Sequence, residues 1–213
     1  MTYTYEYPHP AVTADVVVFT FDNDTLKVLL IQRGRPPAEG EWAIPGGFVN
    51  IDESLKRAAW RELNEETGVH AAYLRQLGAF GHPDRDPRER IITVAYIALL
   101  PVDRLHIEAG SDAMDARLFG LQELPELAFD HAKILRRAFE RLQQYFADAS
   151  TALHLLPETF TMSQLRRVHE LVMSETLDKR NFSKKMQASG LVTPTGEKQK
   201  VGSHRPAALY RAA

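Results

Sequence analysis

The hydrophobic positions of the first 130 residues fall in short runs that predict β-strands. Apolar and β-branched residues dominate 13–22 and 25–33, and Asp22-Asn23-Asp24 lies between them, so we expect a β-hairpin. Residues 42–50 predict a short strand followed by a turn. Further strands are expected over three segments, the second of which is continuously apolar and so expected to be buried: 69–79, 91–102 and 116–121.

Two segments instead show the helical period. Residues 54–67 predict a helix with Asp52 or Ser54 as its N-cap and Gly68 just beyond its end. A second helix is predicted over 130–147, because its apolar residues fall on one side: Ile134, Leu135, Ala138, Leu142 and Phe146. Helices on both faces of a mixed sheet predict the α/β class, as an α/β/α sandwich over residues 1–150.

The pattern changes at about residues 149–161. Apolar residues from Met162 to Val172 mark one helix, and Phe182 with Met186 mark the apolar side of a second. Two short β-like runs, 191–192 and 207–210, then enclose a loop that contains Gly and Lys. This order of two helices and a hairpin predicts a small winged-helix domain over residues 151–213.

Composition excludes several kinds of chemistry. The chain has no cysteine, which excludes disulfides, thiolate catalysis and zinc–cysteine sites and agrees with a cytoplasmic protein. We expect no signal peptide in the first twenty residues, and no apolar run is long enough to predict a membrane span. The net charge of −2 is unevenly distributed along the chain. From Thr161 onward there are ten Lys and Arg and four Asp and Glu, whereas the residues before Thr161 include 16 Lys and Arg and 24 Asp and Glu. A basic tail predicts an anionic partner.

The densest chemical pattern runs from Gly47 to Val69. Its spacing is Gly47, five residues, Glu53, seven residues, Arg61-Glu62-Leu63, one residue, Glu65-Glu66, one residue, Gly68-Val69. At 100° per residue, Glu62 and Glu66 share the stripe of the apolar residues, and Glu65 lies at its edge.

Three glutamates in this arrangement are either a solvated acidic face or a cation site. At i, i+3 and i+4 they repel one another by about 0.2–0.5 kcal/mol per pair, and two of them face the core. A divalent cation would offset these costs, and ligands that offer only oxygen favour Mg²⁺ or Mn²⁺. Arg61 is then either a surface residue or a partner that orients the glutamates, and Glu53 either a partner of the helix dipole or an outer metal ligand.

This pattern resembles the box of the Nudix hydrolases at every fixed position. The resemblance implies Mg²⁺-dependent hydrolysis of a nucleoside diphosphate linked to a group X, by attack of water on phosphorus. It implies that Glu62, Glu65 and Glu66 bind the metal together with the carbonyl of Gly46, with Arg61 and Glu53 in support. The general base is either a box glutamate or a carboxylate on a later loop, where Glu108 and Asp112 are candidates.

The group X is suggested by a loop over residues 82–90, which carries three arginines. Arg85 and Arg88 either clamp a phosphate or pair with the acidic residues of their own loop, Asp84, Asp86 and Glu89. Arg33 and Arg35 are weaker candidates of the same kind. Because the loop resembles that of ADP-ribose-type Nudix proteins, ADP-ribose is the expected ligand.

The second helix of the tail has a basic face opposite Phe182 and Met186. We expect this face and the neighbouring wing to contact DNA, the face as a recognition helix and the wing at the phosphates. The alternatives are a solvated helix and a tail that only completes a dimer. The candidate DNA-binding residues are Arg180, Asn181, Lys184 and Lys185 on the helix and Lys198, Lys200 and Arg205 on the wing.

Three stretches of the tail, 160–165, 177–185 and 204–211, resemble the winged helix of the NrtR-type regulators of NAD metabolism. The resemblance implies a homodimeric repressor that leaves a double-stranded DNA operator when ADP-ribose or a relative binds. Many such regulators have a degraded box, whereas this box is intact. We therefore expect a Mg²⁺-dependent pyrophosphohydrolase of ADP-ribose coupled to a DNA-binding domain; the alternative is a repressor that senses ADP-ribose without hydrolysing it.

Overall fold

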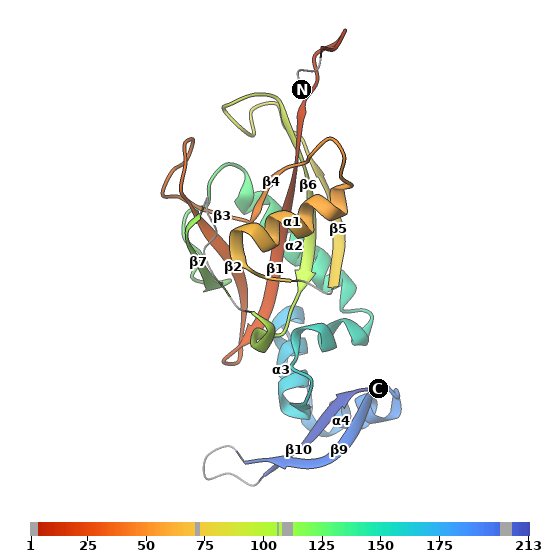
Figure 1. Ribbon diagram of the computed structural model, residues 1–213. Helices are drawn as coiled ribbons and strands as arrows, with labels where there is room; N and C mark the ends of the chain where they lie inside the picture. The colour runs from red at the N-terminus through yellow and green to blue at the C-terminus, as the bar shows by residue number, and fades with distance from the viewer. Residues whose placement is uncertain (1–3, 71–72, 106, 108–112, 201–205) are drawn as a thin grey trace.

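The computed structural model describes residues 4–70, 73–105, 107, 113–200 and 206–213. Its two parts follow one another along the long axis of the molecule, with the part that contains the large mixed sheet at one end and the smaller C-terminal part at the other (Figure 1).

A mixed sheet forms the centre of the first part, and β1 (Ala11–Asp22) is its middle strand. β1 pairs antiparallel with β2 (Thr25–Arg33) and parallel with β6 (Ile91–Leu99). The principal order is β3-β2-β1-β6-β5; β4 also pairs with β1, and β7 with β2. The remaining strands are β3 (Trp42–Ala43), β4 (Gly46–Phe48), β5 (Tyr73–Phe80) and β7 (Ala113–Gly120).

The predicted hairpin is confirmed. Asp22 pairs with Thr25 across a turn in which Asn23 and Asp24 have φ values of 48° and 56°. Both angles lie in the left-handed region that a two-residue hairpin turn requires, and Asn and Asp tolerate it better than most residues.

One helix covers each face of the sheet, so the predicted α/β/α sandwich is confirmed (Figure 1). α1 (Leu55–Thr67) packs on Val16 and Val18, while α2 (His131–Tyr145) packs on the opposite face of β1. Of the two candidate N-caps of α1, the structure selects Ser54, whose hydroxyl accepts a hydrogen bond from the Arg57 amide. Gly68 ends the helix at φ 69°.

Several element boundaries differ from the sequence prediction. β5 begins at Tyr73 rather than at residue 69, because Val69 leaves the helix and packs into the core below it. β6 ends at Leu99, just ahead of Pro101 and the short 3-10 helix η1 (Val102–Arg104). β7 begins three residues earlier than expected, and the segment 42–50 holds two short strands separated by Ile44-Pro45.

The second part is a winged helix, as predicted. It contains the 3-10 helix η2 (Ala149–Leu155), β8 (Phe160–Thr161), α3 (Met162–Met173), α4 (Lys179–Ala188), β9 (Val192–Gln199) and β10 (Ala207–Ala212). A reciprocal capping box between Thr161 and Gln164 starts α3. β9 is longer than the two residues expected and extends into the predicted loop, so the wing is an extended hairpin.

A continuous hydrophobic core joins the two parts. Phe146, at the end of α2, packs in the same cluster as Leu165 and Phe182 of the winged helix. The side-chain amide of Gln143 on α2 also donates to the carbonyl of Val172 on α3 at 2.9 Å. Among the described residues, no helix is both long enough and apolar enough to cross a lipid bilayer.

Candidate active site and nucleic-acid interface

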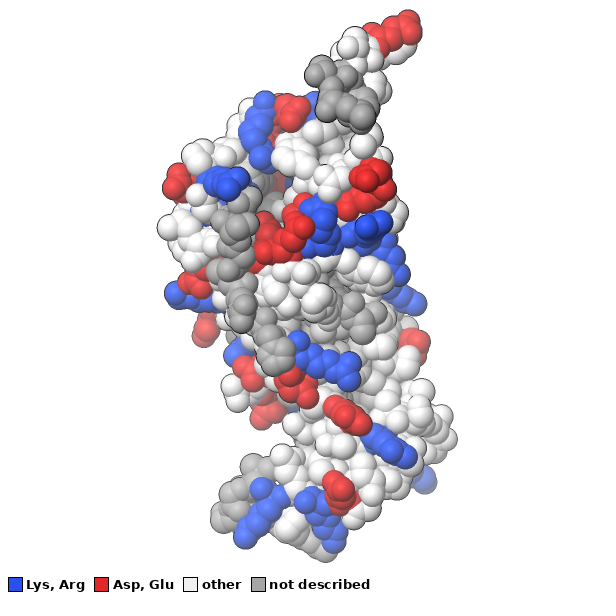
Figure 2. Space-filling view, in the orientation of Figure 1, with Lys and Arg blue, Asp and Glu red and all other residues white. Residues whose placement is uncertain are grey.

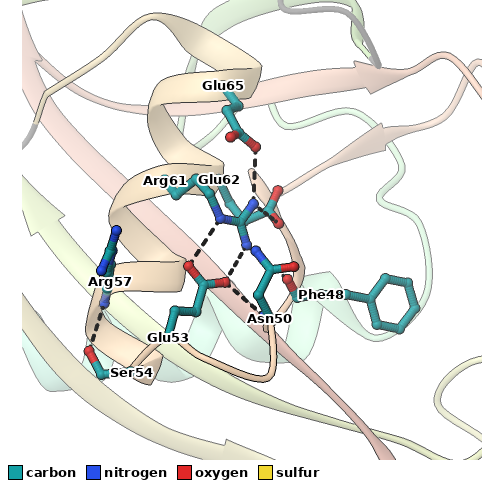
Figure 3. Close-up of polar contacts among 8 residues, drawn as sticks. All are labelled: Phe48, Asn50, Glu53, Ser54, Arg57, Arg61, Glu62 and Glu65. Atoms are coloured by element: carbon teal, nitrogen blue, oxygen red, sulfur yellow. Dashed lines mark hydrogen bonds and ion pairs between the residues drawn. The ribbon is translucent and has the colours of Figure 1, made fainter. Parts of the chain in front are cut away.

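Arg61 lies at the centre of the box (Figure 3). Its guanidinium donates to both carboxylate oxygens of Glu53, at 3.1 and 2.6 Å, and to the carbonyl of Phe48 at 2.9 Å. It also contacts Glu62 at 2.7 Å and Glu65 at 3.0 Å. Of the two interpretations of Arg61, the structure therefore supports the one in which it orients the glutamates.

Glu53 connects Arg61 to the turn before α1. Its carboxylate accepts the Asn50 amide at 2.8 Å as well as the guanidinium. The hydrogen bonds from Arg61 first, and then the one from Asn50, lower the pKa of Glu53 to about 2. In turn, the hydrogen bonds to Glu53 raise the pKa of Arg61. Glu53 thus stays ionised and holds Arg61 in place.

The other three box glutamates differ in environment. Burial raises the pKa of Glu66 to about 8, even though its carboxylate accepts the Gly46 amide at 2.8 Å. Burial also raises the pKa of Glu62 against the opposing effect of Arg61. Glu65 is 57% exposed, at the edge of the helix face. Two carboxylates therefore lie where the negative charge is costly, as the helix geometry predicts.

Two glycines leave room for carboxylates. A Cβ added to Gly47 would lie 2.5 Å from the Glu62 carboxyl carbon, and one added to Gly46 would lie 2.3 Å from Oδ1 of Asp15. Real Cβ atoms do not approach other atoms this closely, so a side chain at Gly47 would displace the Glu62 carboxylate, and one at Gly46 would also collide with the backbone oxygen of Ala14 at 2.5 Å. The glycines are therefore part of the site as well as of its turn.

The donor chemistry of the box fits a hard divalent cation. Glu62, Glu65, Glu66 and the Gly46 carbonyl offer only oxygen, and the raised pKa of Glu66 marks a carboxylate that a cation would stabilise. In the part of the chain that the structure describes, no three acidic, His or Cys side chains converge as a metal cluster. Instead, Arg61 holds Glu62 and Glu65, and the Gly46 amide holds Glu66. The candidate bases Glu108 and Asp112 lie outside the described residues.

A cavity of about 450 Å³ opens beside the box. Figure 2 shows acidic and basic side chains gathered around a hollow near α1. The cavity is large enough for a nucleotide-sized ligand. Its titratable lining includes Asp15, Arg33, Arg61, Glu62, Glu66 and His131.

The four arginines considered as substrate contacts, Arg33, Arg35, Arg85 and Arg88, all line this cavity. Arg85 is 4% exposed and donates to both oxygens of Asp130, at 2.8 and 3.2 Å. This partner, 45 positions away, is not one of the loop carboxylates considered for it. Nε and Nη2 of Arg85 are therefore occupied by Asp130 at the cavity wall, and its contact with a phosphate stays a prediction.

Arg88 and Arg33 lie near aromatic rings at the same cavity. Arg88 pairs with Asp86 at 2.8 Å, as one of the two interpretations of the loop holds, and its guanidinium lies 5.3 Å from the Phe48 ring. Arg33 lies 4.9 Å from the Phe129 ring and donates to the Pro37 carbonyl. Burial lowers the pKa of Arg33. Both cations remain beside the cavity, on an aromatic surface suited to a planar group.

The cavity residues that the sequence interpretation missed include two aromatic and two titratable ones. Phe48 and Phe129 supply its rings, and Asp15 and His131 supply polar groups in its wall. Asp15 left a visible signal, since it is a lone charge inside the apolar run of β1. His131 and Phe129 had no comparable signal in the sequence, because only the fold brings the start of α2 to the box.

The candidate nucleic-acid interface lies on α4. Asp178 caps the helix by accepting the Asn181 amide at 2.8 Å, while Phe182 and Met186 are buried. The opposite face is exposed and carries Arg180, Asn181, Lys184 and Lys185. Arg180 and Lys184 also line a shallow groove along the helix. On the wing, Lys198 and Lys200 are exposed, and Arg205 lies outside the described residues.

Comparison with known proteins identifies the class to which this fold and box belong. The NUDIX domain family matches residues 9–141, so the chain is a member of the Nudix family. The NrtR DNA-binding winged helix domain matches residues 152–212. With both domains in this order, the chain belongs to the NrtR group of Nudix-related transcriptional regulators.

The similarity to individual relatives extends over both domains. The chain is 36% identical to the ADPR responsive transcriptional repressor NtrR of Acinetobacter baylyi over 97% of its own length and 83% of the relative's. A crystal structure of Shewanella oneidensis NrtR complexed with a 27mer DNA superposes with a TM-score of 0.80 at 34% identity, covering 95% of this chain and 93% of that one.

Two further comparisons concern the Nudix part. The NUDIX domain of Shewanella oneidensis NrtR complexed with ADP ribose matches with a TM-score of 0.58 at 37% identity, over 64% of this chain and 90% of that one. An ADP-ribose pyrophosphatase of Methanocaldococcus jannaschii is 43% identical over 61% of this chain and 73% of its own length.

Proposed function

We propose that this protein is an ADP-ribose-responsive transcriptional repressor that also hydrolyses its ligand. The observation that carries the proposal is that one chain joins a cavity lined by an intact Nudix box to an exposed basic helix. The names of its relatives support both halves, because one is an ADPR responsive repressor and another an ADP-ribose pyrophosphatase.

The Nudix cavity is the proposed ADP-ribose site. Its carboxylates and Gly46 would hold Mg²⁺, which neutralises charge on the diphosphate and activates water. Arg61 and Glu53 orient the glutamates, while Arg33 and Arg88 attract the anionic ligand. The reaction adds one water across the diphosphate and yields AMP and ribose 5-phosphate.

The exposed face of α4 is the proposed DNA-recognition surface, with Lys198, Lys200 and Arg205 of the wing at the phosphates. A helix with a buried apolar side and a basic, polar outer side is what a major-groove reader requires. We further propose that the protein binds its operator as a homodimer, which light scattering of the full-length chain tests directly.

A repressor that binds ADP-ribose without hydrolysing it is the second candidate. It is favoured by one observation, namely that Arg61 and the Gly46 amide hold the box glutamates apart from one another. The two candidates differ in turnover alone, so binding measurements cannot separate them.

A substrate panel separates them. The protein is incubated with Mg²⁺ and ADP-ribose, NADH, ADP-glucose or diadenosine diphosphate, and products are resolved by chromatography, with and without DNA from its own promoter. We expect AMP and ribose 5-phosphate from ADP-ribose, and release of the promoter DNA by ADP-ribose. Release without AMP would establish the non-hydrolytic repressor, and AMP without any DNA binding would leave only the enzyme.

A further inference from the structure

Gln187 is an uncharged residue within the basic groove of α4. It is exposed, and it lines the groove together with Lys179, Arg180, Ser183 and Lys184. At 100° per residue, Gln187 lies about 20° from Arg180 around the helix and about two turns further along it. An amide neutralises no phosphate, so Gln187 cannot contribute to DNA binding in the way that its cationic neighbours do.

Tyr210 of the wing holds this amide. Nε2 of Gln187 donates to the Tyr210 hydroxyl oxygen at 3.0 Å, although the two residues are 23 positions apart in the chain. Tyr210 belongs to β10, the middle strand of the three-stranded sheet, and its partly buried ring packs against the hydrophobic core. α4 packs beside the same sheet (Figure 1). The exposed side chain of Gln187 is therefore tied to a rigid part of the domain.

The bond to Tyr210 leaves part of the amide available. A glutamine amide has two N–H groups and one carbonyl oxygen, and Tyr210 takes one N–H. Among the described residues, Oε1 and the second N–H of Gln187 form no further hydrogen bond. Adenine presents the matching pair at its major-groove edge, an acceptor at N7 and a donor at N6, and the other three bases do not.

The anchoring of Gln187 favours such a contact. An exposed glutamine loses rotamer freedom when it binds a partner, and this loss weakens binding. Because Tyr210 already restricts the side chain, part of the loss precedes the arrival of DNA. Arg180 and Lys184 on the same face attract the phosphates, which fix the orientation of a helix on the duplex but do not select a sequence.

We propose that Gln187 recognises an adenine in the major groove and that Tyr210 positions its amide. The inference rests on the proposed function, since it concerns the same DNA-recognition surface. It adds one residue that determines sequence specificity and one positioning residue on the wing, in a surface whose other candidates are mostly cations.

Selection from a DNA library tests the inference. The library is the protein's own promoter fragment with each base pair randomised, and the full-length protein selects from it in the absence of ADP-ribose. We expect the wild type to favour A·T over the other pairs by about 5- to 100-fold at the position that Gln187 contacts. In Gln187→Ala, this preference alone should fall to within about 2-fold. The salt dependence of binding should be unchanged, because no charge is removed.

Two further variants make the test independent of any single substitution. A carboxylate accepts hydrogen bonds only, so Gln187→Glu should exchange the preference at this position from adenine to cytosine, whose N4 is a donor. Tyr210→Phe keeps the ring in the core and removes the hydroxyl, which should reduce the adenine preference by about 2- to 10-fold at this position only. Gln144→Ala, at an exposed position of α2, is the control and should give the wild-type profile.

Each outcome decides the inference. A wild-type profile in Gln187→Ala overturns it and leaves the proposed function intact. Equal weakening of all sequences in that variant also overturns it, because Gln187 would then only brace α4 against the wing. If Gln187→Ala loses the preference and Tyr210→Phe does not reduce it, the positioning role of Tyr210 is wrong. Failure of the wild type to bind promoter DNA overturns both the inference and the proposed function.

Discussion

The ring of His169 on α3 lies 5.3 Å from the ring of Phe182 on α4, in an edge-to-face arrangement. The ring of Phe146, at the end of α2, lies 5.2 Å from the same imidazole. His169 therefore connects the last helix of the Nudix part to the buried side of the basic helix. It is 8% exposed, and its Nε2 has no hydrogen-bond partner.

The burial of His169 predicts a specific pH dependence of stability. Desolvation lowers its pKa to about 4, against about 6.5 in an unfolded chain. Below pH 6.5 the imidazole of His169 binds a proton in the unfolded chain but not in the native state. The free energy of unfolding is therefore unaffected by this group above pH 6.5 and decreases as the pH falls toward 4. The decrease is at most about 3 kcal/mol in the free energy of unfolding.

Urea unfolding at pH 7, 6 and 5 measures this dependence. His169→Phe retains a ring between Phe146 and Phe182 but cannot titrate, so its stability should fall less steeply with acid. His70→Phe, at an exposed position, should follow the wild type. Equal slopes for His169→Phe and the wild type would contradict the assignment.

The sequence was most informative where a local pattern determines the structure. The Asn23-Asp24 turn, the cap at Gly68 and the Arg61–Glu62 spacing each depend on residues close together in the chain. Arg85 shows what a local pattern cannot predict. Its loop suggested neighbouring carboxylates as partners, yet its ion pair is with Asp130, which the fold brings from the start of α2. The polar wall formed by Asp15 and His131 escaped prediction for the same reason.

Replacement of Gly47 should impair the box without unfolding the domain. The added Cβ of Gly47→Ala would lie 2.5 Å from the Glu62 carboxyl carbon, which is the mobile end of a side chain and can shift. We expect ADP-ribose hydrolysis to fall by about 10- to 100-fold through this displacement, with a change of no more than about 1 kcal/mol in the free energy of unfolding.

Gly120→Ala is the control for this experiment, since its Cβ would approach no atom closer than 3.7 Å and should leave turnover unchanged. Kinetics with Mg²⁺ and thermal unfolding in EDTA provide the two readouts. Full activity of Gly47→Ala would show that the position of Glu62 is not important for the reaction.

Arg61→Lys tests whether hydrolysis needs the planar guanidinium group or only its positive charge. Arg61 contacts Glu53, Glu62 and Glu65 at once, and an ammonium group cannot reproduce that planar arrangement. The substitution keeps the charge but should lower hydrolysis by at least about 10-fold and the Tm by about 2–4 °C. Arg57→Lys, on the exposed side of the same helix, should change neither quantity. Unchanged hydrolysis in Arg61→Lys would mean that charge alone suffices.

The basic face of α4 should bind DNA phosphates. Arg180 and Lys184 are exposed and line one shallow groove, so the double variant Arg180→Ala/Lys184→Ala should weaken binding to promoter DNA by at least about 10-fold. The slope of log affinity against log salt concentration should become shallower by about one for each phosphate that the variant no longer neutralises. Anisotropy titrations at several salt concentrations measure both quantities.

The matched control for this face removes the same charge from α2. Lys133 and Arg137 are exposed there, and Lys133→Ala/Arg137→Ala should leave the salt dependence as in the wild type. Because Phe182 and Met186 hold α4 from its buried side, the α4 variant should unfold at the wild-type temperature. If both double variants weakened DNA binding equally, the effect would reflect net charge alone, and α4 would not be the DNA-recognition surface.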